Sequence, residues 1–215
     1  AFDATFNDAI MAMCAGGLRQ YMQKHAELPE QSLKAMVPVS LRKPGDMDSA
    51  NAVGSISVNL ATNIADPVKR MIAIRDSASA GKEFFFQMSA NEAQLYSMLM
   101  QAPGMLLVPL GLMSKMPPFN TVISNVPGIL QPMYWNGARM EGSYPASIIM
   151  DGVAVNITMV TYDKNVDFGI MACRRSLPQI QRLIDYMESA LVELEEAAGI
   201  TGSTEAKPLL RKKTV

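Results

Sequence analysis

A short β-branched run that ends in a Pro-Gly pair constrains the fold of this chain more than any other stretch. The run Thr121–Ile123 is typical of a buried strand, and Pro127-Gly128 breaks a strand and turns the chain. Ser124 and Asn125 therefore lie at the predicted strand end, where a rigid turn places small polar groups well to meet a substrate. An asparagine that caps its own turn explains the same pattern without a function, so two interpretations stand for this stretch.

Hydrophobic periodicity predicts a mixed β-sheet flanked by α-helices, which is an α/β fold. Alternating apolar residues between turn signals indicate strands, and apolar residues three or four apart indicate helices. Pro38 within the first strand indicates an edge or a bulge, and Asp163-Lys164-Asn165 between the last two strands indicates a hairpin. The predicted strands are 33–41, 51–62, 121–123, 132–140, 153–162 and 166–173, and the predicted helices are 2–25, 66–100 with a break near Gly81, and 176–199.

The composition is that of a globular chain with one large domain or two small ones. Of the 215 residues, 49% are hydrophobic and 18% are charged, which excludes a disordered chain. A net charge of -1 argues against a nucleic-acid partner. Cys14 and Cys173 are predicted to be reduced core thiols of a cytosolic protein, and no segment near Ala1 resembles a signal peptide. Because the chain starts with Ala1 inside a predicted folding unit, we expect a fragment or a processed half of something larger.

The start of the first predicted helix carries polar residues, of which some have a structural explanation and one does not. Thr5 is a good N-cap, and Asp8, three residues later, completes a capping box and suits the positive end of the helix dipole. Asn7 is a mediocre helix former without such a structural reason, so it is the stronger functional candidate. His25, the only histidine, is better explained as a cation near the end of the helix than as a catalytic base.

The chain has eighteen methionines, and several of them cluster in a long, almost uncharged stretch in its middle. Methionine fills irregular apolar space, so these residues are either core filler or an adaptable wall for an acyl chain. The clustered ones are Met98, Met100, Met105, Met113 and Met116. The stretch 95–113 approaches transmembrane length, but prolines interrupt it. It is predicted to form broken helices that line an apolar tunnel, touch a membrane surface or belong to an ordinary core. Residues 201–215 are predicted to be a polar, basic tail, which is either solvated or a weak membrane anchor.

The chemistry of an active site is incomplete in this sequence. One histidine and two distant cysteines cannot form a metal site. Neither a nucleophile elbow nor a phosphate-binding glycine loop is present, and no cofactor is expected. A mixed sheet with polar strand ends and a large apolar wall supplies half of an active site at most.

Several short motifs follow one another along the chain. In order, they are Thr5-Phe6-Asn7-Asp8, Val37-Pro38-Val39-Ser40-Leu41-Arg42, Asn51-Ala52-Val53-Gly54, Ala65-Asp66-Pro67, Ser124-Asn125-Val126-Pro127-Gly128 and Asn156-Ile157-Thr158 with Tyr162-Asp163. This order resembles that of one family, the C-terminal domain of the bacterial wax ester synthase/diacylglycerol acyltransferases. The resemblance covers about the first two hundred residues, which are predicted to form one domain (1–200). Two departures are Ala50, where the family usually has glycine, and Ile129, where proline is common.

This resemblance implies a fold of the CoA-dependent acyltransferase type, with two similar domains and an active site between them. It implies transfer of a long acyl group from acyl-CoA, as substrate, to a fatty alcohol or a diacylglycerol. The catalytic histidine is expected in a His-His-x-x-x-Asp-Gly motif of an N-terminal domain, which would be the partner of this chain. There it would act as a general base that deprotonates the alcohol.

The same resemblance assigns roles to residues of this chain. Asn7 and Asp8 are expected to support the catalytic face, and substrate contacts are expected at Asn51, Gly54, Ser124, Asn125, Val126, Pro127 and Gly128. The implied location is the cytoplasm, with peripheral contact to a membrane or a lipid droplet. Two other interpretations remain open, namely a non-catalytic lipid-binding or docking module, and an acyltransferase for peptidyl or polyketide thioesters. The long uncharged segment favours lipid acceptors over the latter.

Overall fold

The computed structural model describes residues 2–25, 27–40, 53–89, 92–93, 95–96, 98–99, 102, 107, 109–112 and 117–200. The expectations for Asn51, for the tail 201–215 and for most of the methionine-rich stretch fall outside these residues.

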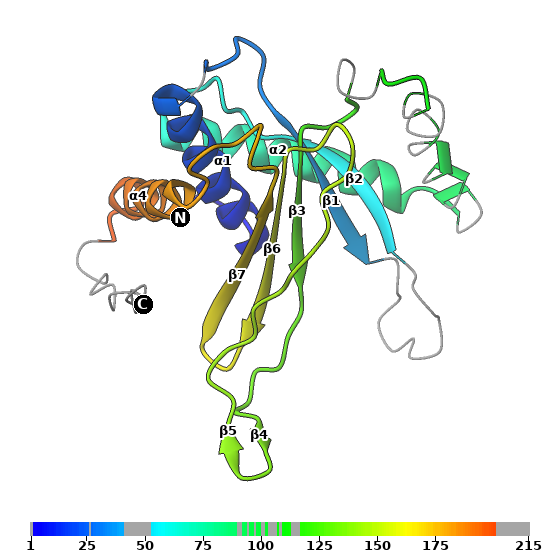
Figure 1. The fold of residues 1–215 in the computed structure, drawn as a ribbon. Coiled ribbons are helices and arrows are strands. Elements are labelled where there is room, and N and C mark those ends of the chain that lie inside the picture. Colours follow the sequence, from blue (N-terminus) through cyan, green and yellow to red (C-terminus); the bar gives the residue numbers. More distant parts are fainter. Residues whose placement is uncertain are drawn as a thin grey trace.

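Five strands form one mixed sheet, as the sequence predicts (Figure 1). They are β1 (Lys34–Ser40), β2 (Val53–Asn59), β3 (Thr121–Val126), β6 (Val155–Tyr162) and β7 (Asn165–Ala172). Their order in the sheet is β2-β1-β3-β6-β7. The pairs β1–β2 and β6–β7 are antiparallel, and the pairs β1–β3 and β3–β6 are parallel. The predicted hairpin is confirmed, because β6 and β7 pair up to Tyr162↔Asn165 around a turn in which Asp163 has a φ of 52°.

Three helices pack together with one face of this sheet to form the core. They are α1 (Phe6–His25), α2 (Pro67–Phe86) and α4 (Arg182–Ala197). The register places alternate residues of every strand on this face, because paired residues in neighbouring strands point the same way. The core therefore joins helix residues with strand residues of one parity, among them Met11, Cys14, Leu18, Met71, Ile74, Leu183 and Met187 from the helices and Ile56, Val58, Ile123, Val155 and Ile157 from the strands.

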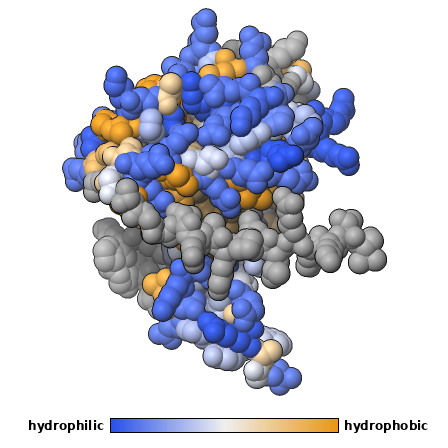
Figure 2. Space-filling model, turned by 90° about the vertical axis from the view of Figure 1, so that its left-hand side faces the viewer, coloured by the Kyte–Doolittle hydropathy of each residue, from blue (hydrophilic) through white to orange (hydrophobic). Residues whose placement is uncertain are grey.

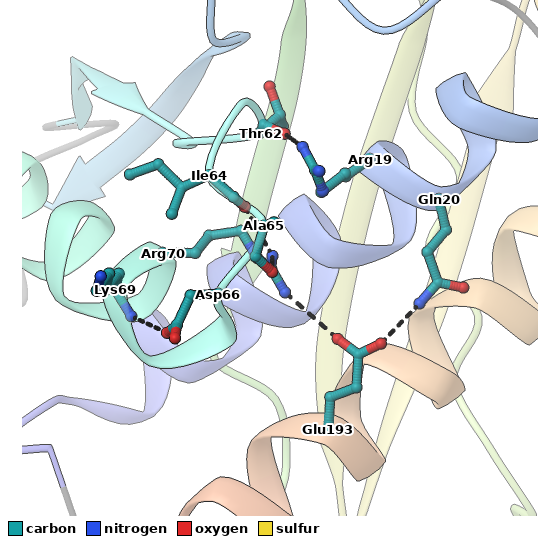
Figure 3. A network of polar contacts seen from close by, with 9 residues as sticks. All are labelled: Arg19, Gln20, Thr62, Ile64, Ala65, Asp66, Lys69, Arg70 and Glu193. Carbon is teal, nitrogen blue, oxygen red and sulfur yellow. Dashed lines mark hydrogen bonds and ion pairs between the residues drawn. The ribbon is translucent and has the colours of Figure 1, made fainter.

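A polar network locks the three helices together (Figure 3). Arg70 of α2 is 2% exposed and donates through one nitrogen to the carbonyls of Ile64 and Ala65, each at 3.0 Å. Its other terminal nitrogen lies 3.5 Å from Oε2 of Glu193 in α4, and Oε1 of the same carboxylate accepts a hydrogen bond from Gln20 in α1. Burial lowers the pKa of Arg70 and the charge of Glu193 opposes that shift.

An extended segment, residues 141–150 and here called the strap, covers part of the other face of the sheet. Asn156 of β6 donates to the carbonyl of Ile148, and Thr158 donates to the hydroxyl of Ser147. In β7, a Cβ atom on Gly169 would lie 1.6 Å from the carbonyl oxygen of Pro145, so only glycine allows this contact. Asn156, from the Asn156-Ile157-Thr158 motif, thus lies in a buried strand and is 7% exposed.

The strand predicted within 132–140 is present at Trp135, but it is only two residues long. Two short strands, β4 (Tyr134–Trp135) and β5 (Ala138–Arg139), form a separate ribbon there. Asn136 and Gly137 connect them with φ values of 48° and 82°, which is the two-residue turn that Asn-Gly favours. The ribbon projects from the lower end of the sheet in Figure 1, and this end is also at the bottom of Figure 2.

Several predicted element boundaries also change, each for a local reason. The helix expected from Phe2 begins at Phe6, because Phe2 and Asp3 have positive φ angles. The expected break at Gly81 does not occur, since the packing of α2 outweighs the roughly 1 kcal/mol preference of helices for alanine over glycine. The helix expected to be capped by Ser176 begins at Arg182, because Gln179 has a φ of 55°.

Two further boundaries follow the prediction, and one strand ends earlier than predicted. Asp66 caps α2 by accepting a hydrogen bond from the backbone of Lys69 at 2.8 Å. Gly199 follows α4 with a φ of 72°, as expected of a helix end. The strand β2 ends at Asn59, three residues before the predicted end, because the Asn59 side chain accepts from the backbone of Ala61, whose φ is 49°.

Candidate active-site face

The sheet opens between its two central parallel strands. The strands β1 and β3 pair only at Ala35↔Thr121 and Met36↔Val122, although they contain seven and six residues. Beyond these pairs they diverge, as Figure 1 shows, and the edge of β3 that faces β1 has no partner strand among the described residues over 123–126. Pro38 follows the last pair in β1 and cannot donate a backbone hydrogen bond, so it cannot extend a ladder with β3. The strand that contains Pro38 was predicted to be an edge or to contain a bulge. It is an internal strand, and its pairing stops before Pro38 only on the side of β3.

Asn125 lies on the border of this opening and is bonded to Asn7. Its partner in β6 is Met159, and both side chains point to the face of the sheet that carries the helices. The Asn125 side-chain nitrogen donates to Oδ1 of Asn7 at 2.6 Å, across 118 positions of sequence. The structure therefore brings together two residues that the sequence singled out separately.

Asp8 has the structural role that its position indicates. Its Oδ2 accepts from the backbone and the hydroxyl of Thr5 at 2.8 and 2.6 Å, and its own backbone donates back to that hydroxyl at 3.3 Å. This is the predicted capping box, and it fixes the first turn of α1, which carries Asn7. Asp8 is buried, at 2% exposure, and its Oδ1 has no hydrogen-bond partner among the described residues.

Ser124 and Asn125 point to opposite faces of the sheet, because they are neighbours on one strand. Ser124 pairs with Thr158 and shares the face covered by the strap. Ser124 and Asn125 can line one site only where the edge of β3 is open, because a group at that edge can reach both faces of the sheet.

The turn after β3 is held by the end of β6. The backbone of Gly128 donates to the Thr161 hydroxyl at 3.0 Å. A Cβ atom at Gly128 would lie 1.8 Å from the Thr161 carbonyl oxygen, so glycine is required here by close backbone approach. Val126 and Pro127 are exposed beside this turn. Nothing in the local sequence identifies Thr161 as the residue that fixes the turn.

Gly54 does not join this group, although the sequence suggested it as a binding residue. It lies in β2, two strands away from β3, and is buried beneath α2. A Cβ atom there would lie 2.1 Å from the ring of Phe85. Packing of that ring explains the glycine without a substrate.

The remaining reactive side chains lie outside the group. Burial raises the pKa of Cys14 to about 12, as expected of a core thiol. Cys173 is only half-buried, and hydrogen bonds from Ser176 lower its pKa, so the expectation of a core thiol is wrong for it. His25 is 2.8 Å from the Tyr186 hydroxyl at the opposite end of α1 from Asn7. Among the described residues, no three acidic, histidine or cysteine side chains are grouped as metal ligands.

Comparison with known proteins assigns this arrangement to a class. The sequence model of the WS/DGAT C-terminal domain matches residues 49–195, and the chain therefore belongs to that family. The solved wax ester synthase/diacylglycerol acyltransferase from Marinobacter aquaeolei VT8 is 41% identical, with a TM-score of 0.81 over 92% of this chain and 45% of that one. A condensation domain of the enacyloxin polyketide synthase, at 12% identity and a TM-score of 0.56, shares the fold alone.

Curated relatives carry names of the same kind. A putative diacylglycerol O-acyltransferase of Mycobacterium tuberculosis is 44% identical over 201 residues, which are 93% of this chain and 45% of that protein. The O-acyltransferase WSD of Acinetobacter baylyi is 42% identical over 191 residues, or 89% of this chain and 42% of that protein. The chain thus spans less than half the length of these relatives.

Proposed function

We propose that this chain is the C-terminal half of an O-acyltransferase that moves a long acyl group from acyl-CoA to a fatty alcohol or a diacylglycerol. The observation that carries the proposal is the opening between β1 and β3, with the Asn7–Asn125 pair on its border. An extended thioester arm with amide groups suits this place, because the unpaired edge of β3 offers backbone donors and acceptors to it.

The proton-handling group belongs to the other half of the enzyme. A histidine there takes the proton of the alcohol hydroxyl, and the oxygen attacks the thioester carbonyl. The tetrahedral intermediate collapses with loss of the CoA thiolate, which leaves as the thiol after taking up a proton, and the ester remains. This chain contributes the wall that holds the thioester and the acceptor in line.

The segment 129–150 is the part of this chain that docks onto the other half. Large apolar side chains are exposed along its whole length, with 71% of Leu130, 86% of Trp135 and 79% of Ile148 accessible. The segment is nevertheless held in place, because the Tyr162 hydroxyl accepts from the backbone of Met133 and donates to the carbonyl of Met140. A flat lipid surface would contact only the tip of such a segment, whereas a second protein half can cover all of it.

Supplying the missing half tests the proposal. We expect no ester from palmitoyl-CoA and hexadecanol with this chain alone, and ester formation when a half carrying His-His-x-x-x-Asp-Gly is added or fused to it. Trp135→Ser should weaken association of the halves without unfolding the chain, because the Trp135 side chain is 86% exposed. Two folded halves that associate without forming any ester would contradict the proposal.

A lipid-binding module is the second candidate, and one observation favours it. Phe84 and Phe86 at the end of α2 are 54% and 65% exposed, and Leu95, Met98 and Leu99 nearby in sequence are exposed as well. No helix of the described residues is long and apolar enough to cross a membrane. Side chains of this kind suit peripheral contact with lipid, or with the acyl chain of a substrate. This role would be supported if the chain alone sediments with lipid vesicles and the double variant Phe84→Ser/Phe86→Ser does not.

A further inference from the structure

The β4–β5 ribbon has too few contacts of its own to keep a fixed position. Each of its strands has two residues, and in the described part of the chain they pair only with each other. A two-stranded hairpin without a packed face is at best marginally stable in water. All four strand residues are exposed, with 63% of Tyr134 and 86% of Trp135 accessible. The position of the ribbon is therefore set where it joins the sheet.

A single buried hydroxyl joins the ribbon to the sheet. Tyr162, the last residue of β6, is 2% exposed. Its hydroxyl accepts from the backbone of Met133 at 2.9 Å and donates to the carbonyl of Met140 at 2.8 Å. Met133 precedes β4 and Met140 follows β5, and the Met140 backbone donates to the Met133 carbonyl at 2.8 Å. These two methionines, here called the neck, are thus held to each other and to β6 at one point.

Asp163 adds a weaker support beside Tyr162. Its backbone donates to the carbonyl of Ile129 at 2.9 Å, and its carboxylate lies 3.2 Å from the guanidinium of Arg139 in β5. The Arg139 side chain is 52% exposed, so this ion pair contributes little. The Tyr162 hydroxyl, which is buried and makes two hydrogen bonds, is therefore the main constraint on the orientation of the ribbon.

We propose that Tyr162 is a positioning residue that preorganises the ribbon and thereby sets the affinity of this chain for the other half of the enzyme. Holding exposed aromatic side chains in one orientation removes part of the entropy cost of docking them onto a partner. The inference rests on the proposed function for the identity of that partner. This chain spans less than half the length of its relatives, which leaves room for a second half of similar size. Tyr162 itself is buried, so it acts only through the ribbon.

Two buried tyrosines form a matched pair for the test. Tyr162→Phe keeps the ring and removes the hydroxyl at the neck. Tyr21→Phe is the control, because Tyr21 is 1% exposed and its hydroxyl donates to the carbonyl of Pro178. Pro178 follows β7 at the end where Ala172 pairs with Val155, which is the end of β6 away from Tyr162. Both variants should lower the melting temperature measured by circular dichroism, since each loses buried hydrogen bonding.

Calorimetry then measures the affinity for a half that carries His-His-x-x-x-Asp-Gly, at a temperature where all variants are folded. Tyr162→Phe should raise the Kd roughly 5- to 50-fold, because docking must then order a ribbon that has lost two hydrogen bonds. Tyr21→Phe should keep the Kd within about twofold of the parent. In the Trp135→Ser background, Tyr162→Phe should raise the Kd less than in the parent, because the two changes act through the same ribbon.

The outcomes separate this inference from the proposed function. At saturating concentrations of the other half, Tyr162→Phe should form ester at the kcat of the parent, because the docked partner orders the ribbon. If the Kd responds to Tyr162→Phe as expected but no ester forms in any variant, the proposed reaction fails and the role of Tyr162 stands. If Tyr162→Phe lowers the melting temperature but leaves the Kd within about twofold of the parent, the hydroxyl only stabilises the fold and the inference is overturned. Parent halves that do not associate overturn it as well, whereas the fused enzyme still tests the reaction.

Discussion

The Arg70 network allows a prediction in which the size of the effect distinguishes two explanations of stability. A simple count of ion pairs would rank Arg70 and Glu193 equally, since each forms the same interhelical pair. Their surroundings differ, because the Arg70 side chain is 2% exposed and that of Glu193 is 46% exposed. A half-exposed carboxylate recovers its hydration when the pair is broken, so the pair itself contributes less than about 1 kcal/mol.

Most of the stabilisation by Arg70 comes from its two bonds to the carbonyls of Ile64 and Ala65. Arg70→Ala removes two hydrogen bonds from a charged donor, at about 1.5–3 kcal/mol each, and it also empties the space beside α1. The expected loss is about 3–5 kcal/mol, which for a chain of this size lowers the melting temperature by roughly 6–20 °C. Glu193→Gln, in contrast, should cost at most about 1 kcal/mol.

Urea unfolding followed by circular dichroism measures both losses. Arg182→Ala is the control, because its pair with Asp185 is exposed on both sides and should contribute at most about 0.5 kcal/mol. Equal losses for Arg70→Ala and Glu193→Gln would refute the reasoning, because they would show that the charge pair, and not the carbonyl contacts, holds the helices.

Three further predictions follow from single contacts. Gly54→Ala should destabilise the chain by about 3 kcal/mol in urea unfolding, because the new Cβ would lie 2.1 Å from a buried ring, whereas Gly81→Ala has 3.4 Å of space in a helix and should stabilise by about 0.5–1 kcal/mol. Thr5→Ala removes the N-cap of α1 and should cost about 1 kcal/mol in the same assay. Iodoacetamide should alkylate Cys173 with a half-maximal rate below pH 9, since its lowered pKa increases the thiolate fraction there, and should leave Cys14 unmodified until the chain unfolds.

The elements with a strong local signal could be predicted from sequence. Asp66-Pro67 starts a helix, Asp163 lies in a hairpin turn and Thr5 caps α1, because each acts on residues within four positions of itself. The wrong element boundaries also have local causes, because turn residues interrupt runs that otherwise favour a strand or a helix. The run at 132–140 has strand-like residues, but Asn136-Gly137 folds it into a ribbon, and the positive φ of Gln179 delays the last helix.

The candidate site could be predicted only as a set of residues, because its geometry depends on register. Which strand lies beside β3, and how far that pairing continues, decides whether Asn125 faces an open edge or a closed sheet. A shift of one residue would turn Asn125 away from Asn7 and bring Ser124 to the helical face. Gly54 and Gly128 match family motifs equally well, but the strand pairing gives them different places. Gly54 of β2 packs under a ring, whereas Gly128 lies in the turn after β3. Motif order indicates which residues are candidates, and only the three-dimensional pairing of β1, β3 and β6 separates those that share a site from those that serve the core.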